Sequence, residues 1–380
     1  MNLRKVVVAP DSFKGSLSAQ EAAEFIKLGV TYVFPESEVI SFPLSDGGEG
    51  FINVLCKQSD FSEILLEVNG PFMKTRQAKY LYNDKERKAV IESAEACGIY
   101  NEDAASLNPM IATSYGLGEI INNAVGRGVR EIIIGLGGSC TNDGGMGMLR
   151  ALCFRFYDSF GHELSGRGKD LGKLTKIEAP SDLEDLKKIK FTVACDVRNP
   201  LLGDKGCARI FAPQKGADPQ MVFELEEGMT NYAIQIEKFS GKNLKDTQGA
   251  GAAGGLGFAL MNIFDARFIS GVELILKLKK FEEELKNCDL VITGEGSLDL
   301  QTLMGKVPVA VLGACLSYKI PVIALGGNVK DIEKLNEIGF SSIFSINSYQ
   351  AELSELMDNE IASRNLFQTV VQIMKTIRCF

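Results

Sequence analysis

The chain has 380 residues, of which 45% are apolar and 24% are charged, so it can bury a sizeable core and is not globally disordered. Its 41 Lys and Arg residues against 49 Asp and Glu residues give a net charge of −8. That balance argues against a general nucleic-acid-binding protein, which needs a basic surface. At roughly 100–200 residues per domain, the length indicates two or three domains.

The N-terminal segment has the pattern of a βαβ unit. KVVVAP (5–10) is typical of a buried strand, and Ser18 and Glu21 have the spacing of a capping box before a helical apolar pattern that runs to Val33. A second strand is predicted over 38–42. The start of the chain has too short an apolar run for a signal peptide, and no stretch approaches the ~18 apolar residues of a membrane helix. We therefore expect a cytoplasmic protein.

The middle of the chain has a different pattern, because its first predicted strands are joined by short turns as in a meander. Beyond them, a helix is predicted over 252–264, and the C-terminal part returns to alternating strands and helices. Alternation of this kind predicts parallel βαβ units. The predicted strands of the middle and C-terminal parts are 63–68, 75–82, 88–92, 130–135, 191–195, 289–293, 321–325 and 342–346.

This change of pattern predicts an α/β fold with an inserted domain. We expect residues 1–70 and 271–380 to form one domain with an open α/β sheet. Residues 71–270 are expected to form a mixed α/β domain between the two halves.

Chemistry that needs histidine or clustered cysteine is nearly excluded. His162 is the single histidine and lies in a polar stretch typical of a surface loop, so a Ser-His-Asp triad or a multi-His metal site is not expected. The nine cysteines contain no CxxC pair, which fits reduced thiols in a cytosolic protein. Acid–base work therefore falls to carboxylates or lysine.

The densest glycine-rich loop is GLGGSCTNDGGMG (135–147), which follows a predicted strand. Glycine lets backbone amides approach an oxyanion, hydroxyl groups add donors, and the start of a following helix would add its positive dipole end. The loop therefore favours phosphate binding over a purely structural turn. The candidate ligand-binding residues in it are Gly137, Gly138, Ser139, Thr141 and Asn142.

Other nucleotide-binding signatures are weak or missing. The sequence contains no Walker A motif and no protein-kinase signature. GAGAAGGLG (249–257) matches GxGxxG, but no clear strand precedes it. Close packing of a helix is therefore the favoured interpretation of these glycines.

Several short polar clusters follow predicted strands or lie in turns. Carboxylates there can hold Mg²⁺ or deprotonate a hydroxyl, and lysines can neutralise phosphate charge. Any one cluster alone is more typical of a solvated turn, but together they favour phosphoryl transfer, which depends on positioning and electrostatics. The clusters are 11–16, 45–50, 195–200, 213–216 and 294–299.

These clusters carry a resemblance to the bacterial glycerate kinases of type 1. Two departures are small, because Cys140 stands where Ala is usual and Leu298 where Ile is also common. The matching runs, in order along nearly the whole chain, are APDSFKGSLSA (9–19), PLSDGGEG (43–50), GLGGSCTNDGGMGML (135–149), CDVRNPLLG (195–203), APQKGA (212–217), GAGAAGGLG (249–257) and VITGEGSLDLQTLMGKVP (291–308).

The resemblance implies ATP-dependent phosphorylation of D-glycerate with Mg²⁺. It also implies two α/β domains, of which the one built from both chain ends is Rossmann- or flavodoxin-like, with an active site in the cleft between them. Family members form 2-phosphoglycerate or 3-phosphoglycerate, and we favour the 2-hydroxyl. We expect a monomer or a homodimer that closes on its ligands and has no nucleic-acid or membrane partner.

The matched motifs suggest a role for each polar residue. Asp196 is the first candidate for the base that accepts the substrate proton, and Asp46 is the second. Lys14, Lys215 and Arg198 would pair with the glycerate carboxylate or the transferring phosphoryl group. Further candidates are Asp11, Ser12 and Asn199 for substrate, Gly294, Glu295 and Gly296 for the ATP phosphates, and Asp143 and Asp299 for the metal.

Two other classes of protein stay open on the sequence alone. A nicotinamide-dependent oxidoreductase would use Gly249–Gly254, and a non-catalytic small-molecule-binding protein would use the same cleft. The kinase interpretation differs from both because it alone predicts ADP release in the presence of D-glycerate.

Overall fold

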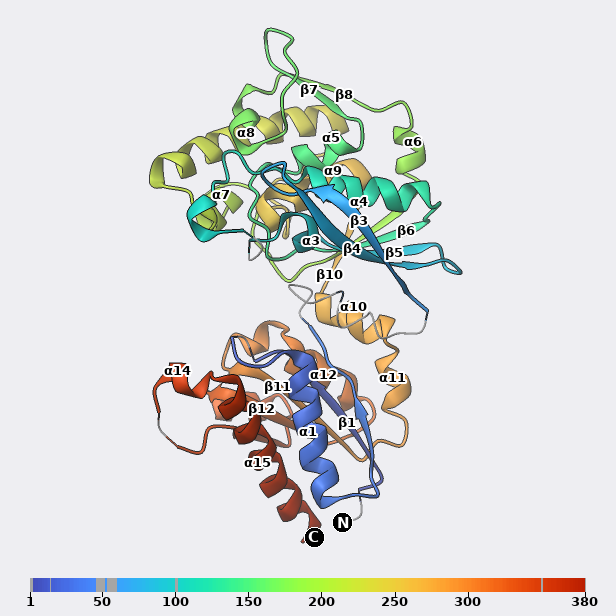
Figure 1. Cartoon of the computed structure of the whole chain (residues 1–380), viewed down its shortest axis with the longest axis vertical. Helices are drawn as coiled ribbons and strands as arrows, with labels where there is room; N and C mark the ends of the chain where they lie inside the picture. The colour runs from blue at the N-terminus through green and yellow to red at the C-terminus, as the bar shows by residue number, and fades with distance from the viewer. Residues whose placement is uncertain are drawn as a thin grey trace. The chain divides into compact units, whose positions relative to one another are not determined.

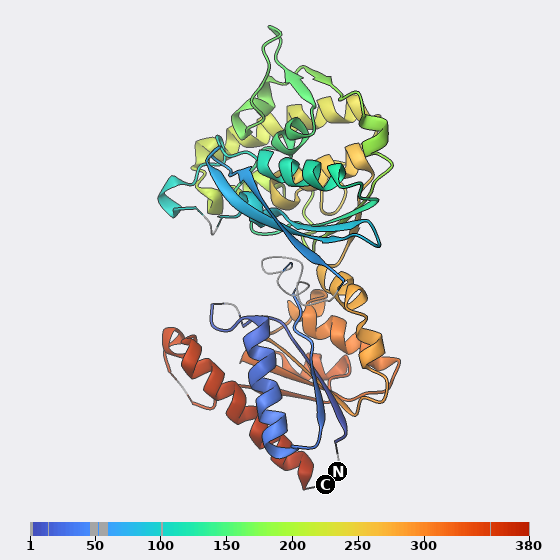
Figure 2. The same cartoon turned by 45° about the vertical axis from the view of Figure 1, so that its right-hand side comes forward.

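The structure is a computed structural model that describes residues 3–13, 15–45, 52, 60–99, 102–349 and 351–379. Contacts divide the chain into two compact units, Met1–Asp46 with Val272–Phe380 and Gly47–Gly271 (Figures 1 and 2). The predicted α/β class is confirmed, because one unit holds a parallel sheet and the other a mixed sheet. The boundary near 70 is corrected: β3 (Ser62–Asn69) pairs with β4 (Thr75–Asn83), which places these residues in the second unit.

The first unit has a parallel sheet, with the order β13-β12-β11-β1-β2 among the residues that the structure describes. β1 lies between β11 and β2, with Val7 opposite both Val291 and Ile40. Val7 and Val291 are fully buried, as expected for strands covered on both faces. The strands are β1 (Lys5–Pro10), β2 (Glu38–Ser41), β11 (Leu290–Leu298), β12 (Val322–Val329) and β13 (Ser342–Ser345).

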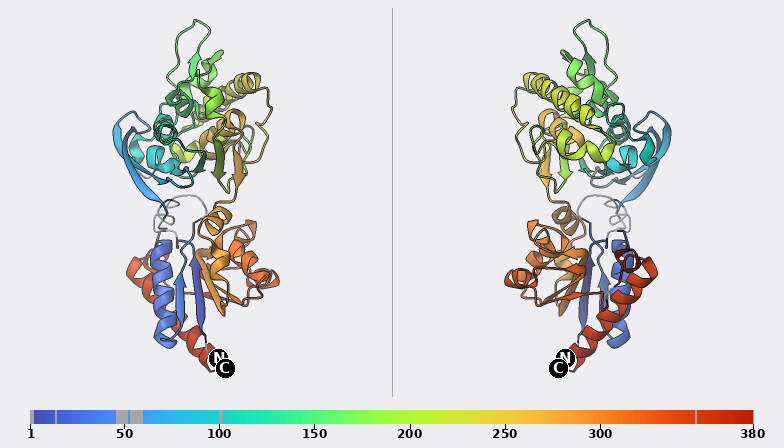
Figure 3. Two further views of the ribbon diagram at one scale, coloured as in Figure 1. Left: turned by 90° about the vertical axis from the view of Figure 1, so that its right-hand side faces the viewer. Right: turned by 90° about the vertical axis from the view of Figure 1, so that its left-hand side faces the viewer.

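Helices cover both faces of this sheet (Figure 3). α1 (Ala19–Val33) and α15 (Asn359–Arg378) pack together on one face, and α12 (Val307–Leu316) packs against the strands on the other. The predicted capping box is confirmed: Glu21 N donates to Ser18 Oγ at 3.2 Å, and Ser18 N donates back to Glu21 Oε2 at 2.8 Å. The shorter helices are α10 (Gly271–Leu278), α11 (Phe281–Glu284), α13 (Ile332–Glu337) and α14 (Leu353–Leu356).

The strand order of the first unit reverses beside β1. The chain passes from β1 to β2 on one side, and β11 then lies on the other side of β1. In open α/β sheets such a reversal leaves a crevice outside the carboxyl ends of the two strands, where ligands bind. Asp11 and Ser12 directly follow β1, beside Gly294 of β11. The strand predicted over 289–293 runs on to Leu298, so the polar residues 294–298 form its C-terminal half, and Asp299 follows it.

The second unit has a mixed sheet, with the order β10-β9-β6-β5-β4-β3 in the described part of the chain. β3, β4 and β5 form the predicted antiparallel meander, and the remaining neighbours are parallel. The further strands of this sheet are β5 (Lys88–Glu92), β6 (Glu131–Gly135), β9 (Lys190–Ala194) and β10 (Arg267–Ile269). A separate hairpin pairs β7 (Arg155–Tyr157) with β8 (Lys176–Glu178), and in the loop beyond β7 His162 is exposed, as expected.

Helices and short turns complete the second unit. α4 (Tyr115–Gly126) packs on β3, β4 and β5, and α9 (Leu256–Phe264) packs on β9. The helix predicted over 252–264 is split, because Ala253 and Gly254 have positive φ and end the turn η5 (Ala252–Gly255) before α9 begins. The others are α3 (Ser93–Cys97), α5 (Met146–Ala151), α6 (Leu183–Leu186), α7 (Cys207–Phe211), α8 (Pro219–Ser240), η2 (Ala104–Ser106), η3 (Gly168–Lys173) and η4 (Pro213–Lys215).

None of the described helices has both the length and the apolar character needed to span a membrane.

Candidate functional site

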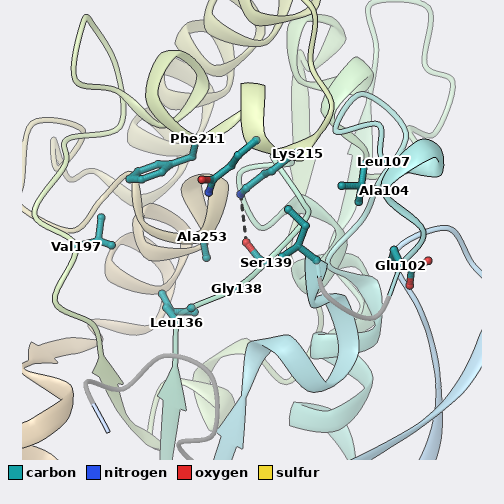
Figure 4. Close-up of a pocket in the computed structure, with 13 residues that line it drawn as sticks. Glu102, Ala104, Leu107, Leu136, Gly138, Ser139, Val197, Phe211, Lys215 and Ala253 are labelled. Atoms are coloured by element: carbon teal, nitrogen blue, oxygen red, sulfur yellow. Dashed lines mark hydrogen bonds between the residues drawn. The ribbon is translucent and has the colours of Figure 1, made fainter. Parts of the chain in front are cut away.

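A cavity of about 620 Å³ lies in the second unit, where the glycine-rich loop leaves β6. Gly137, Gly138, Ser139 and Lys215, all predicted from the sequence, line it together (Figure 4). Its other lining residues are mostly apolar: Ile99, Glu102, Ala104, Leu107, Leu136, Val197, Phe211, Gln214 and Ala253. Convergent polar groups in a largely apolar cavity of this size are typical of a small-molecule site.

Lys215 supplies a buried positive charge to this cavity. The residue is only 2% exposed, and its Nζ donates to Thr141 O at 2.7 Å and to Ser139 Oγ at 3.3 Å. Burial lowers the pKa of Lys215, since desolvation disfavours the charged ammonium. A buried ammonium beside a hydroxyl and glycine backbone is suited to neutralise an anionic ligand.

The turn that carries Lys215 is fixed by the following glycine. Gly216 has a φ of +89°, and a Cβ added there would lie 2.2 Å from Leu107 O. Only glycine fits such a conformation and such a close approach without strain. The glycine of the APQKGA run therefore holds Lys215 and the segment around Leu107 on adjacent sides of the cavity.

The second half of the glycine-rich loop surrounds a carboxylate of the chain itself. Asp143 has no exposed surface, and its Oδ2 accepts hydrogen bonds from Ser114 N at 2.7 Å, Ser114 Oγ at 2.8 Å and Gly147 N at 3.2 Å. Its Oδ1 accepts from Gly145 N at 3.0 Å. Burial raises the pKa of Asp143, and the donated hydrogen bonds oppose that shift.

These contacts correct two expectations. The amides at the start of α5, which were expected to hold a phosphate, bind Asp143 instead. Asp143 was also expected to hold a metal, but its oxygens are turned into the protein and already accept protein donors. Thr141 and Asn142 were predicted to bind the cofactor, yet both are fully buried and neither lines the cavity. Within this loop the phosphate-binding prediction is thereby restricted to Gly137, Gly138 and Ser139, which line the cavity with Lys215.

The GAGAAGGLG run packs the loops of the second unit against each other. Gly254 has a φ of +68°, and a Cβ added there would lie 2.1 Å from Thr141 O. Gly254 O also accepts a hydrogen bond from Gly144 N at 3.0 Å. The residues before the run follow α8 as a turn and not as a strand. The interpretation of these glycines as close packing is therefore confirmed, and the dinucleotide fingerprint is not.

The segment after β9 carries Asp196, Arg198 and Asn199 beside the cavity. Asp196 and Arg198 are exposed, and Val197 between them lines the cavity. The Asn199 side chain donates to Lys205 O at 2.8 Å, so its amide shapes its own loop. This places a carboxylate and a guanidinium on the residues that flank a cavity-lining side chain.

A second polar cluster lies in the first unit, at the strand reversal beside β1. Asp11 N donates to Gly294 O at 2.8 Å, and Asp11 Oδ1 accepts from Ser12 N at 2.6 Å. These contacts bring together the predicted residues Asp11, Ser12, Gly294 and Glu295, which lie far apart in the sequence. Lys14 and Asp46, predicted for the same region, lie outside the described residues.

Glu295 is, with Asp11, a buried carboxyl of this cluster. It is 6% exposed, accepts from Thr302 Oγ1 at 2.6 Å and pairs with Lys306 Nζ at 3.4 Å. Burial raises the pKa of Glu295, and the contacts of Thr302 and Lys306 oppose that rise. A carboxylate repels phosphate, so Glu295 is better suited to a cation than to the direct phosphate contact that the sequence suggested.

The loop after β11 also offers hard oxygen donors near Glu295. Asp299 is half-buried, with Oδ2 accepting from Ser297 Oγ at 3.2 Å and Oδ1 from Gln301 N at 2.8 Å. Mg²⁺ in kinases uses one or two carboxylates together with phosphates and water, and the Glu295–Asp299 donor set fits that chemistry. Within the described ranges, no group of three or more His, Cys, Asp or Glu side chains is arranged to hold a metal.

Sequence reasoning missed the walls of the cavity and the partners of Glu295. Phe211 directly precedes the matched APQKGA run, and Thr302 and Lys306 lie inside the last matched run, so those motifs contained a usable signal. Glu102 and Leu107 lie in no matched run and carry no such signal. Their position follows only from the folding of 102–107 over the cavity.

An α/β protein with a buried lysine and glycine backbone at the end of a parallel strand belongs to the class that binds anionic small molecules. Comparison with known proteins gives the particular family: residues 6–378 match the model of the glycerate kinase family. The chain is 41% identical over 343 residues to a glycerate kinase of Bacillus subtilis, covering 90% of each protein. It is 40% identical over 372 residues to the glycerate 2-kinase of Escherichia coli, covering 96% of this chain and 98% of the relative.

A solved structure agrees with these relatives. A crystal structure from Salmonella typhimurium LT2, provisionally assigned as glycerate kinase 2, has a TM-score of 0.85 and 37% identity, and the match covers 100% of this chain and 99% of the other. The chain therefore belongs to the glycerate kinase family, and it is a kinase.

Proposed function

We propose that this kinase transfers the terminal phosphoryl group of ATP to the 2-hydroxyl of D-glycerate and forms 2-phosphoglycerate. Family membership supports the substrate, and a relative named glycerate 2-kinase supports the position. The observation that carries the proposal is the buried Lys215 ammonium, held at the glycine-rich loop within a cavity. Phosphoryl transfer needs this kind of fixed positive charge, because charge on the phosphoryl oxygens must be stabilised in the transition state.

In this proposal the second unit supplies the phosphate site. Lys215 and the backbone of Gly137 and Gly138 neutralise and orient the phosphates, with Ser139 as a hydroxyl donor. Arg198, beside the cavity, pairs with the substrate carboxylate. Asn199 acts indirectly, since its side-chain hydrogen bond to Lys205 O holds the loop that carries Arg198.

Asp196 is our candidate for the group that accepts the hydroxyl proton. It follows β9 as an exposed carboxylate next to a cavity-lining residue, and a carboxylate in that role deprotonates the attacking oxygen as the new bond forms. Asp46 stays the second candidate. Asp11 and Ser12 stay candidates for substrate contacts from the first unit.

Mg²⁺ would be held by Glu295 and Asp299. When bound, the ion neutralises phosphate charge, which is the chemistry it supplies in other kinases. Lys306 and Thr302 orient the Glu295 carboxylate, and Ser297 orients Asp299.

A coupled assay of ADP release tests the function, with D-glycerate present and absent. Phosphorus NMR of the product then reports which hydroxyl carries the phosphate. Release of ADP with formation of 3-phosphoglycerate would overturn only the position. Stabilisation of the chain by ATP and glycerate without any ADP release would favour the binding-protein alternative and overturn the proposal.

The role of Asp196 has its own test. We expect Asp196→Asn to lower kcat by about 10²–10⁴-fold, as removal of a general base typically does. The matched control is Asp204→Asn, since the Asp204 side chain is 95% exposed and pairs with Arg209 on the surface. Wild-type turnover in the Asp196 variant would assign the proton transfer to another group.

A further inference from the structure

The cavity beside Lys215 has an apolar wall to which the proposed phosphate contacts give no role. At about 620 Å³ it lies in the size range of pockets for drug-sized ligands, well beyond the needs of a three-carbon acid. Figure 4 shows Phe211 and Val197 together on one side of Lys215, with Leu107, Ala104 and Glu102 on the other. The side chains of the first group carry no charge.

We infer that the wall formed by Phe211 and Val197 binds the nucleoside part of the nucleotide, with the phosphates at Lys215. This inference rests on the proposed function, because it assigns the base and ribose of the same ATP.

The aromatic ring of Phe211 is the first argument for this orientation. Among the described residues that line the cavity, Phe211 is the single aromatic one, and it is half-buried, so part of its ring faces the open space. Nucleobases stack on aromatic side chains whatever their hydrogen-bonding edge. Val197 and the backbone turn at Ala253 extend this surface, and all three pack on the core of the unit, which keeps them in place.

Charge supplies the second argument. Glu102 lies on the opposite side of the cavity, and its carboxylate pairs with Arg76 at 3.5 Å. Because Arg76 is already paired with this carboxylate, the pair offers a triphosphate little net attraction, whereas Lys215 lies between the two walls and attracts it. A nucleotide with its phosphates at Lys215 therefore places its uncharged part against Phe211.

The test measures binding of ADP and of inorganic tripolyphosphate to the full chain by calorimetry. We expect Phe211→Ala to raise the Kd for ADP about tenfold, a typical loss for one stacking contact, and to leave tripolyphosphate binding unchanged. Lys215→Met should weaken both ligands. Phe223→Ala, 56% exposed on α8, should leave the Kd for ADP within about twofold of wild type. Leu107→Ala, on the opposite wall of the cavity, should weaken ADP less than Phe211→Ala does.

Three results would overturn the inference. Unchanged ADP affinity in Phe211→Ala removes the stacking contact, and equal loss of tripolyphosphate affinity shows a general distortion of the site. A larger effect of Leu107→Ala than of Phe211→Ala reverses the orientation. If Phe211→Ala does not fold, Phe211→Leu keeps the apolar bulk without the ring and must still weaken ADP selectively.

Turnover separates this inference from the function on which it rests. If wild-type protein releases ADP with D-glycerate but Phe211→Ala leaves the KM for ATP unchanged, only the placement of the nucleoside is wrong. If wild-type protein neither binds ADP nor releases it with D-glycerate, both proposals are wrong.

Discussion

The loop that follows β6 and the C-terminal half of β11 each hold a buried carboxyl, but they use it differently. Asp143, after β6, accepts from backbone amides and from Ser114, which join its loop to the start of α4. Glu295, within β11, accepts from the Thr302 side chain and pairs with the Lys306 side chain. Burial raises the pKa of both carboxyls, so a shifted pKa alone does not distinguish a structural group from one that can meet a ligand.

In our proposal the anion is bound at the β6 loop by Lys215 and not by the amides around Asp143, which already donate to that carboxylate. We therefore expect Lys215→Met to lower kcat/KM by about 10²–10³-fold, because it removes a preorganised charge at the phosphates. Lys205→Met is the matched control, since Lys205 is exposed in the loop that Asn199 closes. Near-normal kinetics in Lys215→Met would show that the loop amides, and not Lys215, bind the phosphates.

A structural role for Asp143 predicts a loss of stability. In Asp143→Asn an NH₂ group replaces one carboxylate oxygen. That group is a donor, and it faces amides or a hydroxyl that donate to the carboxylate in the wild type. We expect the free energy of unfolding, measured in urea, to fall by about 1–3 kcal/mol. Asp185→Asn, on the exposed surface of α6, should change it little. Unchanged stability with lost activity would show instead that the Asp143 carboxylate acts on the ligand.

Glu295→Gln should have the smallest effect on stability but a distinct pH dependence. Because the folded-state pKa of Glu295 is raised, the folded chain holds this proton more tightly than the unfolded chain does. The contribution of Glu295 to stability is therefore largest below the ordinary carboxyl pKa of about 4.3 and declines as pH rises through the folded-state pKa.

In Glu295→Gln this decline should disappear, and the free energy of unfolding at pH 7 should stay within about 1 kcal/mol of wild type, since Thr302 can still donate to the amide oxygen. Thermal unfolding from pH 4 to 8 measures both, with Glu333→Gln on the exposed side of α13 as the control. An unaltered pH profile would show that Glu295 does not titrate in that range.

The sequence carried the local features of this fold well. The strand at 5–10, the capping box at Ser18 and the meander over 63–92 were predictable because each depends on residues that are close in the sequence. The domain boundary was misplaced because it depends on the partner of β3, which a strand pattern does not reveal.

The candidate site was predictable only in part, for the same reason. The glycines and hydroxyl residues of 135–147 predicted a ligand-binding loop, and Lys215 predicted its positive charge. The role of Asp143 is set by Ser114, 29 positions earlier, which helps to hold the Asp143 carboxylate against the amides that were expected to bind a phosphate. No spacing rule connects those two residues.

The insertion of the second unit between the two parts of the first has a consequence for synthesis on the ribosome. β1 bonds to β2 soon after both emerge, but its other neighbour comes much later: Thr293 Oγ1 on β11 donates to Ala9 O across 284 positions. At roughly 10 residues per second, one edge of β1 waits about half a minute for β11. The inserted unit, continuous in the chain, is complete before the unit that began first, so the nascent protein must shield an open strand edge during elongation.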